Sequence, residues 1–147
     1  MTAGAPLRLT DTLDPAVQGR IVQALIAANE AAAGPSSRQP LAILVEDPET
    51  GEATGGLFGR TAWRWLAIET LFVPPPLRAA GLGRRLVAQA EAEALRRGCL
   101  GAWVDTFSHQ APGFYQGLGY RRFGEIEDHP PGHRRIFLRK RLGPTAT

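Results

Sequence analysis

The feature that most constrains the fold is a strand, turn and helix unit in the middle of the chain. The segment "WRWLAIETLFV" is rich in aromatic and β-branched residues, which is typical of a β-strand. The run "PPP" ends this strand because proline cannot donate to a sheet ladder. From Leu82 to Arg97, apolar side chains recur at intervals of three and four residues, which predicts an amphipathic helix that ends at Gly98. This unit predicts a fold in which strands and helices alternate.

The segments on either side of this unit continue the alternation. Before it, helical spacing of apolar residues predicts a helix with Asp14 as N-cap, Pro15 in its first turn and Gly34 at its end. The segments "LAILVE" and "TGGLFGR" predict a hairpin across the turn "DPETGE". After the unit, "LGAWVDTF" predicts a strand and "APGFYQGLG" a short helix. The segments "RRFGEIE" and "HRRIFLRKRL" predict a closing pair of strands.

Composition limits the number of domains and the class of protein. With 147 residues, of which 44% are hydrophobic, the chain is long enough for one core and short for two, so we expect a single domain over residues 1–147. The net charge is +3 and the arginines are dispersed, which argues against a nucleic-acid-binding tail. No apolar run is long enough for a signal peptide or a membrane span, and Cys99 is the only cysteine, so we expect a cytoplasmic protein.

The turn from Arg78 to Gly83 has the properties of an anion site. It lies at the start of a helix, where backbone N–H groups lack partners and the helix dipole is positive, and its glycines let a bulky anion approach the backbone. Phosphate or pyrophosphate is therefore the expected ligand. The turn lacks the Gly-Lys-Ser/Thr of a P-loop, and Leu86 stands where a dinucleotide-binding loop needs its third glycine. Neither ATP nor a dinucleotide is favoured.

Two motifs resemble those of one enzyme superfamily. The turn matches Arg/Gln-x-x-Gly-x-Gly/Ala after a strand, which resembles the acetyl-CoA pyrophosphate loop of the GNAT superfamily of N-acetyltransferases. Downstream, "SHQAPGFYQGLGY" resembles the block Asn-x-x-Ala-x-x-Phe-Tyr-x-x-x-Gly-Phe/Tyr of the same superfamily. The resemblance implies a GNAT-like α/β (α+β) fold, with a mixed, mostly antiparallel central sheet flanked by helices. It also implies an acetyl-CoA-dependent N-acyltransferase with acetyl-CoA as co-substrate.

The resemblance assigns cofactor-binding positions residue by residue. The strand before the turn is expected to splay from the next parallel strand and to receive the pantetheine arm of CoA, while the turn binds the pyrophosphate. Ser108 stands where many members have an asparagine that assists CoA binding. The expected cofactor-binding residues are Leu71, Phe72, Val73, Arg78, Ala79, Ala80, Gly81, Leu82, Gly83, Arg84 and Ser108.

The implied reaction needs an acid for the departing thiolate and a base for the incoming amine. Tyr115, at the Phe-Tyr position of the block, is the expected general acid, and a packing role is its alternative. Glu69 is the candidate base because a carboxylate inside an apolar strand is costly unless it faces a cavity or a partner. Its alternatives are solvent exposure or an ion pair with an arginine. We expect no metal, since the three histidines lack metal-ligand spacing.

Other functions and the acceptor are left open. A catalytically inactive CoA-binding regulatory module would keep the turn but lose the acid and base, and a nucleic-acid binder is suggested only by the arginine content. The amine acceptor is unidentified and could be a small molecule or a peptide. We expect neither nucleic acid nor a membrane as a partner, and we leave a homodimer open.

Overall fold

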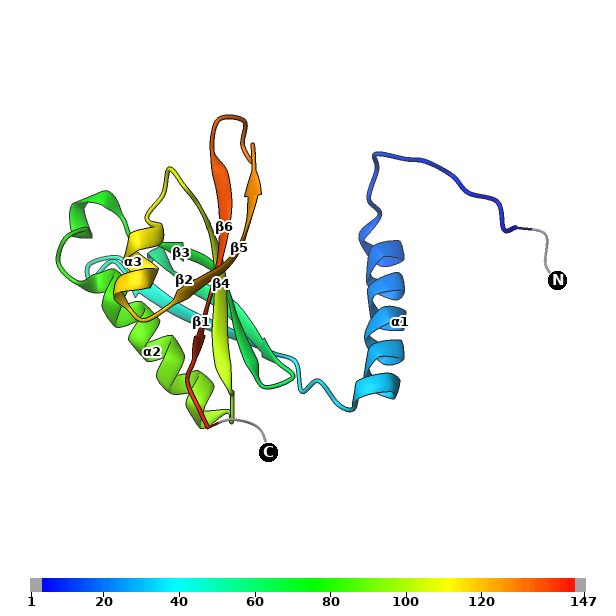
Figure 1. Cartoon of the computed structure of the whole chain (residues 1–147), viewed down its shortest axis with the longest axis horizontal. Coiled ribbons are helices and arrows are strands. Elements are labelled where there is room, and N and C mark those ends of the chain that lie inside the picture. Colours follow the sequence, from blue (N-terminus) through cyan, green and yellow to red (C-terminus); the bar gives the residue numbers. More distant parts are fainter. Residues whose placement is uncertain (1–3, 145–147) are drawn as a thin grey trace. The chain divides into compact units, whose positions relative to one another are not determined.

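The computed structural model describes residues 4–144, and its first regular element is helix α1, Pro15–Ala33 (Figure 1). The Asp14 side chain caps the helix by accepting a hydrogen bond of 2.9 Å from the backbone N–H of Ala16. Gly34 ends it with φ 90°, a conformation that glycine adopts without strain. The predicted helix and its caps are confirmed. The sequence predicts one domain over residues 1–147. Residues 1–3 and 145–147 of this range lie outside the described residues.

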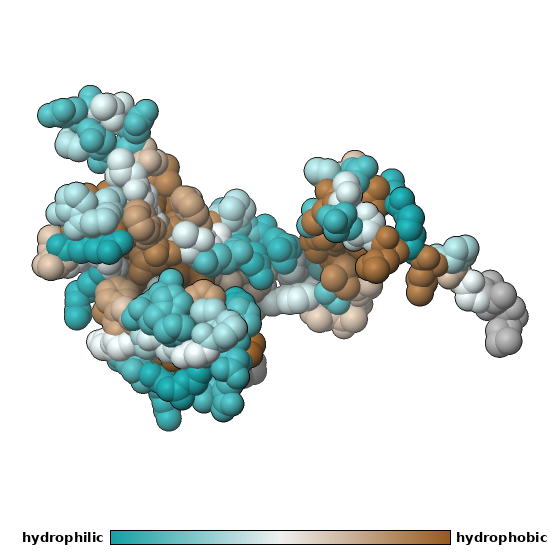
Figure 2. Space-filling model, turned by 90° about the horizontal axis from the view of Figure 1, so that it is seen from above, coloured by the Kyte–Doolittle hydropathy of each residue, from teal (hydrophilic) through white to brown (hydrophobic). Residues whose placement is uncertain are grey.

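The chain divides into two compact units, residues 1–36 and residues 37–147. In the first unit, none of the residues of α1, all of which are described, is buried. The side chains of Val17, Ile21 and Leu25 are 40%, 63% and 60% exposed. Figure 2 shows the apolar residues of both units as brown areas on the surface. All strands of the described residues lie in the second unit.

Six strands form one sheet in the part of the chain that the structure describes, in the order β1-β2-β3-β4-β6-β5. Only β3 and β4 run parallel, and every other neighbouring pair is antiparallel. The mixed, mostly antiparallel sheet of the prediction is therefore confirmed. The strands are β1 Gln39–Glu46, β2 Ala53–Ala62, β3 Trp65–Phe72, β4 Gly101–Phe107, β5 Arg121–Glu127 and β6 Arg134–Arg141.

Two helices of the second unit, α2 (Leu82–Arg96) and α3 (Pro112–Gly117), lie on one face of the sheet (Figure 1), and a short 3-10 helix, η1 (Pro75–Leu77), precedes α2. Helix α2 turns an apolar stripe to the core, as its spacing predicts, although Leu95 at the end of the stripe remains 48% exposed. The stripe packs with strand residues that include Leu57, Leu66 and Leu138, each with 0% exposure. The buried residues of the stripe are Leu86, Val87, Ala90 and Ala94.

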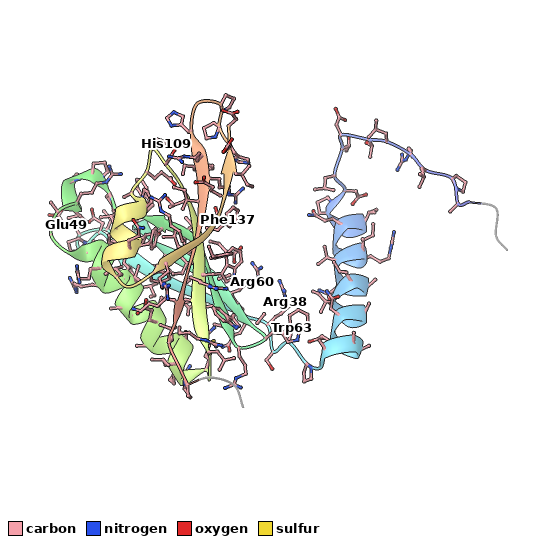
Figure 3. The ribbon with its side chains drawn as sticks, in the orientation of Figure 1. Arg38, Glu49, Arg60, Trp63, His109 and Phe137 are labelled. Carbon is pink, nitrogen blue, oxygen red and sulfur yellow. The ribbon has the colours of Figure 1, made fainter. Side chains whose placement is uncertain are left out.

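Strand pairing assigns the remaining side chains to the opposite face, because directly paired residues point to the same side of a sheet. Leu57 and its neighbours at alternate positions face α2, so Phe58 and Arg60 of β2 face away from it. On β6, Leu138 faces the helices and Phe137 faces away. Figure 3 shows Arg60 and Phe137 projecting from the sheet on the side away from α2 and α3.

The start of β3 differs from the predicted strand "WRWLAIETLFV". Strand β3 begins at Trp65, and Trp63 and Arg64 form a two-residue hairpin turn with φ 47° and 64°. Two positive φ values are typical of a type I′ turn, whose twist matches that of the flanking strands. The turn lacks the usual Asn or Gly. It is held by a hydrogen bond of 2.7 Å from the N–H of Leu100 to the carbonyl of Arg64.

Candidate active site

Strands β3 and β4 separate halfway along their length. Their parallel pairing runs from Trp65 with Gly101 to Ile68 with Val104 and then stops, whereas β2 continues to pair with β3 as far as Phe72. Beyond Ile68, β3 therefore has a strand on one side only. The splay implied by the resemblance is present, and it leaves the β4-facing backbone edge of residues 69–72 without a strand partner.

A cavity of about 320 Å³ lies at this splay. Its wall combines strand residues, the loop after β4 and two aromatic side chains of α3. It contains two carboxylates, one phenol, two threonines and one glutamine among apolar side chains. The lining residues are Ile68, Glu69, Thr70, Leu71, Val104, Asp105, Thr106, Phe107, Gln110, Ala111, Phe114 and Tyr115.

Tyr115 is the buried member of this lining that can exchange a proton. Its side chain is 7% exposed and makes edge-on ring contacts with Phe114 and Tyr120, at centroid distances of 5.0 Å and 5.8 Å. Burial, reinforced by the negative charge of Asp105, raises the pKa of Tyr115 to about 12. The hydroxyl makes no hydrogen bond to the described residues. Because every fully buried side-chain N or O atom among those residues has a hydrogen-bond partner, the Tyr115 oxygen is not fully buried, and it is open to the cavity that Tyr115 lines. Tyr115 is thus a neutral proton donor at neutral pH.

Glu69 occupies the extra position of a bulge. Pairing between β2 and β3 passes from Phe58 with Thr70 to Gly59 with Ile68, which leaves Glu69 unpaired. The bulge turns its carboxylate to the face away from α2, where Oε2 lies 3.0 Å from Nη1 of Arg60. The side chain is 50% exposed and lines the cavity. The structure thus shows both alternatives of the sequence analysis, partial solvent exposure and an ion pair with an arginine, and it also places Glu69 at the cavity, so its role as base stays a prediction.

Asp105 is a site residue that the sequence reasoning missed. It follows the last β3–β4 pair directly, pairs with Phe137 on β6, and lines the same cavity. Its Oδ1 accepts a hydrogen bond of 2.9 Å from Nε of Arg135, and Nη2 of the same guanidinium lies 2.8 Å from it in an ion pair. The signal was available, because Asp105 is a carboxylate inside the apolar strand "LGAWVDTF", as Glu69 is in its own strand.

The turn before α2 has the geometry of an anion site. Gly81 caps the helix in the left-handed conformation with φ 77°, and Ala79 also has a positive φ of 68°. The carbonyl of Gly81 accepts from the N–H of Arg85 at 3.1 Å, so the helix starts at Leu82. The N–H groups of this first turn have no intrahelical acceptor and carry the positive end of the helix dipole. This backbone fits the predicted pyrophosphate site.

Arg78 and Gly83 of the turn have contacts in the structure that the sequence did not predict. Arg78 donates from Nε to the carbonyl of Val73 at 2.9 Å, and its guanidinium lies 5.6 Å from the ring centroid of Phe72. Arg78 thus holds the turn against the end of β3. At Gly83, a Cβ would lie 3.3 Å from Cζ of Phe114. The absence of a side chain there lets α2 approach Phe114.

Ser108 and the histidines join the loop after β4 to the turn between β5 and β6. Ser108 donates its N–H to the carbonyl of Arg134 at 2.8 Å, and its Oγ accepts from the N–H of Arg134 at 2.9 Å. The ring of Phe107 stacks against His109 and His129, at 5.4 Å and 5.7 Å. Within residues 4–144, no cluster of three or more acidic, histidine or cysteine side chains could hold a metal ion, and no helix could cross a membrane.

Comparisons with known proteins agree with this arrangement. The sequence model of the acetyltransferase (GNAT) family matches residues 15–120. Acetyltransferase Atu2258 of Agrobacterium fabrum is 36% identical over 134 residues, which are 91% of this chain and 97% of the relative. Blasticidin-S acetyltransferase of Streptomyces morookaense is 50% identical over 95 residues, which are 64% of this chain and 70% of the relative.

A solved structure agrees as well. The crystal structure of an acetyltransferase from Bacillus cereus superposes with a TM-score of 0.79 and 31% identity, over 92% of this chain and 98% of that one. The family match covers most of the chain, and the splayed strands, the glycine turn and the phenol all lie within it. The chain belongs to the GNAT family and is an acyl-CoA-dependent N-acetyltransferase.

Proposed function

We propose that the enzyme transfers an acetyl group from acetyl-CoA to a primary amine by direct attack, with Tyr115 as the general acid. The observation that carries this proposal is the Tyr115 phenol, which is buried in α3 while its hydroxyl is open to the cavity between β3 and β4. A phenol whose pKa is raised to about 12 stays protonated at neutral pH and can donate its proton to a departing thiolate.

The residues around the start of α2 fit acetyl-CoA, whose thioester supplies the reactive carbonyl. The backbone N–H groups from Ala79 to Arg84 would hold the pyrophosphate, and the guanidiniums of Arg78 and Arg84 would add charge-assisted contacts. The unpaired edge of β3 at Leu71 and Phe72, together with the N–H of Val73 directly after the strand, would hydrogen-bond the pantetheine arm. Ser108 would assist CoA binding indirectly, because its hydrogen bonds with Arg134 fix the loop beside the cavity.

The amine must lose a proton before it attacks. An ammonium group with a lysine-like pKa near 10.4 is neutral in roughly one molecule in a few thousand at pH 7. Glu69 is the proposed base, because its carboxylate lines the cavity and one half of its surface is open to water. It acts directly or through a water, once the amine has displaced the contact with Arg60.

We propose a small-molecule acceptor and a single functional domain over residues 1–147. A cavity of about 320 Å³ suits a small molecule. The relative named for blasticidin S supports the same choice, because it is 50% identical over 95 residues that are 64% of this chain. A peptide acceptor is the competing possibility, and a panel that contains both small amines and peptides separates the two by which of them releases CoA thiol.

A screen of amines with acetyl-CoA, with detection of free thiol, tests this proposal. We expect amine-dependent release of CoA thiol, and stabilisation by CoA of about 2.7 kcal/mol at a hundredfold excess over its dissociation constant. ATP and NADH should stabilise the protein much less. Equal stabilisation by ATP and CoA would contradict the assignment of the turn, and CoA binding without thiol release for any small or peptide amine would contradict catalysis.

A further inference from the structure

Four charged side chains form a row across the sheet, and the two carboxylates among them line the cavity. Arg60 of β2, Glu69 of β3, Asp105 of β4 and Arg135 of β6 come from four consecutive strands in the sheet order. Strand pairing and the two ion pairs put all four on the face away from α2. The signs along the row are positive, negative, negative and positive, so the two carboxylates occupy the centre and a guanidinium flanks them on each side.

The members of this charged row can change partners when a ligand enters. The ion pairs of 3.0 Å between Arg60 and Glu69 and of 2.8 Å between Arg135 and Asp105 are partly exposed, with side-chain exposures between 25% and 50%. Ion pairs at such exposure contribute little net stability, because water and salt screen them. A ligand with complementary charges can therefore replace them without a large cost.

Arg135 is the more rigid of the two guanidiniums. It lies over the rings of Phe107 and Phe137, at 5.8 Å and 5.6 Å from their centroids, while Nε and Nη2 bind Asp105. The hydrogen bond and the 2.8 Å ion-pair contact with Asp105 use Nε and Nη2, which leaves the second terminal nitrogen to donate to a ligand. A planar guanidinium held in this way is well suited to bind a carboxylate.

We infer that the acceptor is a zwitterionic amine, with an ammonium group that binds between Glu69 and Asp105 and a carboxylate that binds Arg135. This inference rests on the proposed function and names the substrate class of the same site. The charged row has two negative and two positive groups, so it is neutral as a whole and matches an amino acid in sign and order. A polyamine would place its second cation near a flanking guanidinium, which is unfavourable.

Matched acceptors test this inference. The proteinogenic amino acids, β-alanine and γ-aminobutyrate are each compared with their primary amides, which keep the amine and lose the carboxylate. The measured quantity is the ratio of kcat/KM for acid and amide in wild type and in Arg135→Gln, since the intrinsic reactivity of each amine cancels in this comparison. We expect the ratio for the best acid to fall at least about tenfold in the variant, while kcat/KM of its amide changes less than about threefold.

Arg139→Gln is the matched control. Arg139 lies four residues further along β6 on the same face, over the ring of Phe123 at 5.3 Å, whereas the ion pair with Asp105 is made by Arg135. This control should leave the ratio unchanged. Asp105→Asn should lower kcat/KM for acid and amide alike, because it weakens the ammonium site that both share. An unchanged ratio in Arg135→Gln, or a ratio that Arg139→Gln lowers equally, would overturn the inference.

Calorimetry separates failure of this inference from failure of the proposed function. If CoA binds but no amine is acetylated, catalysis is refuted, and binding of the same acids and amides to the CoA complex still tests the charged row. Binding of an acid that is stronger than that of its amide in wild type, and equal to it in Arg135→Gln, supports the inference. If amides or diamines bind as tightly as the acids, or if no acid binds at millimolar concentration, the inference is wrong.

Discussion

Replacing Gly83 tests the contact between α2 and α3 that positions Phe114 next to Tyr115. A Cβ at Gly83 would lie 3.3 Å and 3.4 Å from two carbons of the Phe114 ring and 3.7 Å from Cγ2 of Val73. In Gly83→Ala the helix gains about 0.5–1 kcal/mol from the lost glycine entropy, while the ring must move by a few tenths of an ångström, so the net change is near zero. Gly83→Val adds two further methyl carbons in the same place.

The valine variant should therefore be destabilised. Valine recovers only about 0.4 kcal/mol of helix propensity relative to glycine, whereas overpacking of a packed contact costs about 1–3 kcal/mol. We expect Gly83→Val to lower the free energy of unfolding by about 1–2 kcal/mol, which is a fall in Tm of about 2–8 °C for a chain of this size. Turnover should also fall, because Phe114 precedes Tyr115 in α3.

Thermal or urea unfolding measures this effect, and Gly113→Val is the control. Gly113 lies in α3, and a Cβ there would meet nothing within 4 Å, so its replacement should not lower stability. If Gly83→Val is as stable and as active as wild type, then the close approach of α2 to Phe114 does not require glycine. Loss of stability in both valine variants would equally refute the contact-based reasoning.

Three further predictions follow from the turn, the tyrosines and the base. Arg78→Ala should weaken CoA binding by about tenfold without abolishing it in calorimetry, because the backbone donors of the turn remain. Burial raises the pKa of Tyr115 to about 12, and burial with the charge of Glu91 raises that of Tyr120 further, so the folded state keeps protons that the unfolded state loses near pH 10. The contribution of these two tyrosines to stability should therefore be constant below pH 10 and fall above it by up to about 1.4 kcal/mol per pH unit for each tyrosine. Urea titrations in which Tyr115→Phe shows the same fall above pH 10 as wild type would contradict this. Glu69→Gln should flatten the rising limb of the pH profile of kcat/KM, and an unchanged limb would remove Glu69 as the base.

Local signals in the sequence were sufficient for most of the fold. Asp14 and Gly34 bound the first helix because capping depends on a few neighbouring residues. The hairpin turn at Trp63 and Arg64 was missed, since neither residue type favours a positive φ and the turn is held by a contact from Leu100, distant in sequence. Tertiary contacts, rather than local preference, thus select that turn.

Short motifs in the sequence predicted where the turn and Tyr115 lie, but they did not predict the ion pairs of the site. The turn before α2 and the position of Tyr115 follow from short motifs. The ion pairs of Glu69 and Asp105 depend on the bulge in β3 and on the insertion of β6 beside β4, which are set by long-range pairing. Gly83 was interpreted as a requirement of the pyrophosphate, which stays a prediction, and the structure adds that a side chain there would meet Phe114.

Turnover of Tyr115→Phe tests whether the phenol of Tyr115 protonates the leaving thiolate. The substitution keeps the ring contacts with Phe114 and Tyr120 and removes only the hydroxyl that is open to the cavity. With a validated amine acceptor, and under conditions where chemistry limits the rate, kcat should fall by about 10²-fold or more while CoA affinity stays unchanged. Equal turnover of wild type and Tyr115→Phe would contradict the account and leave Tyr115 with a packing role.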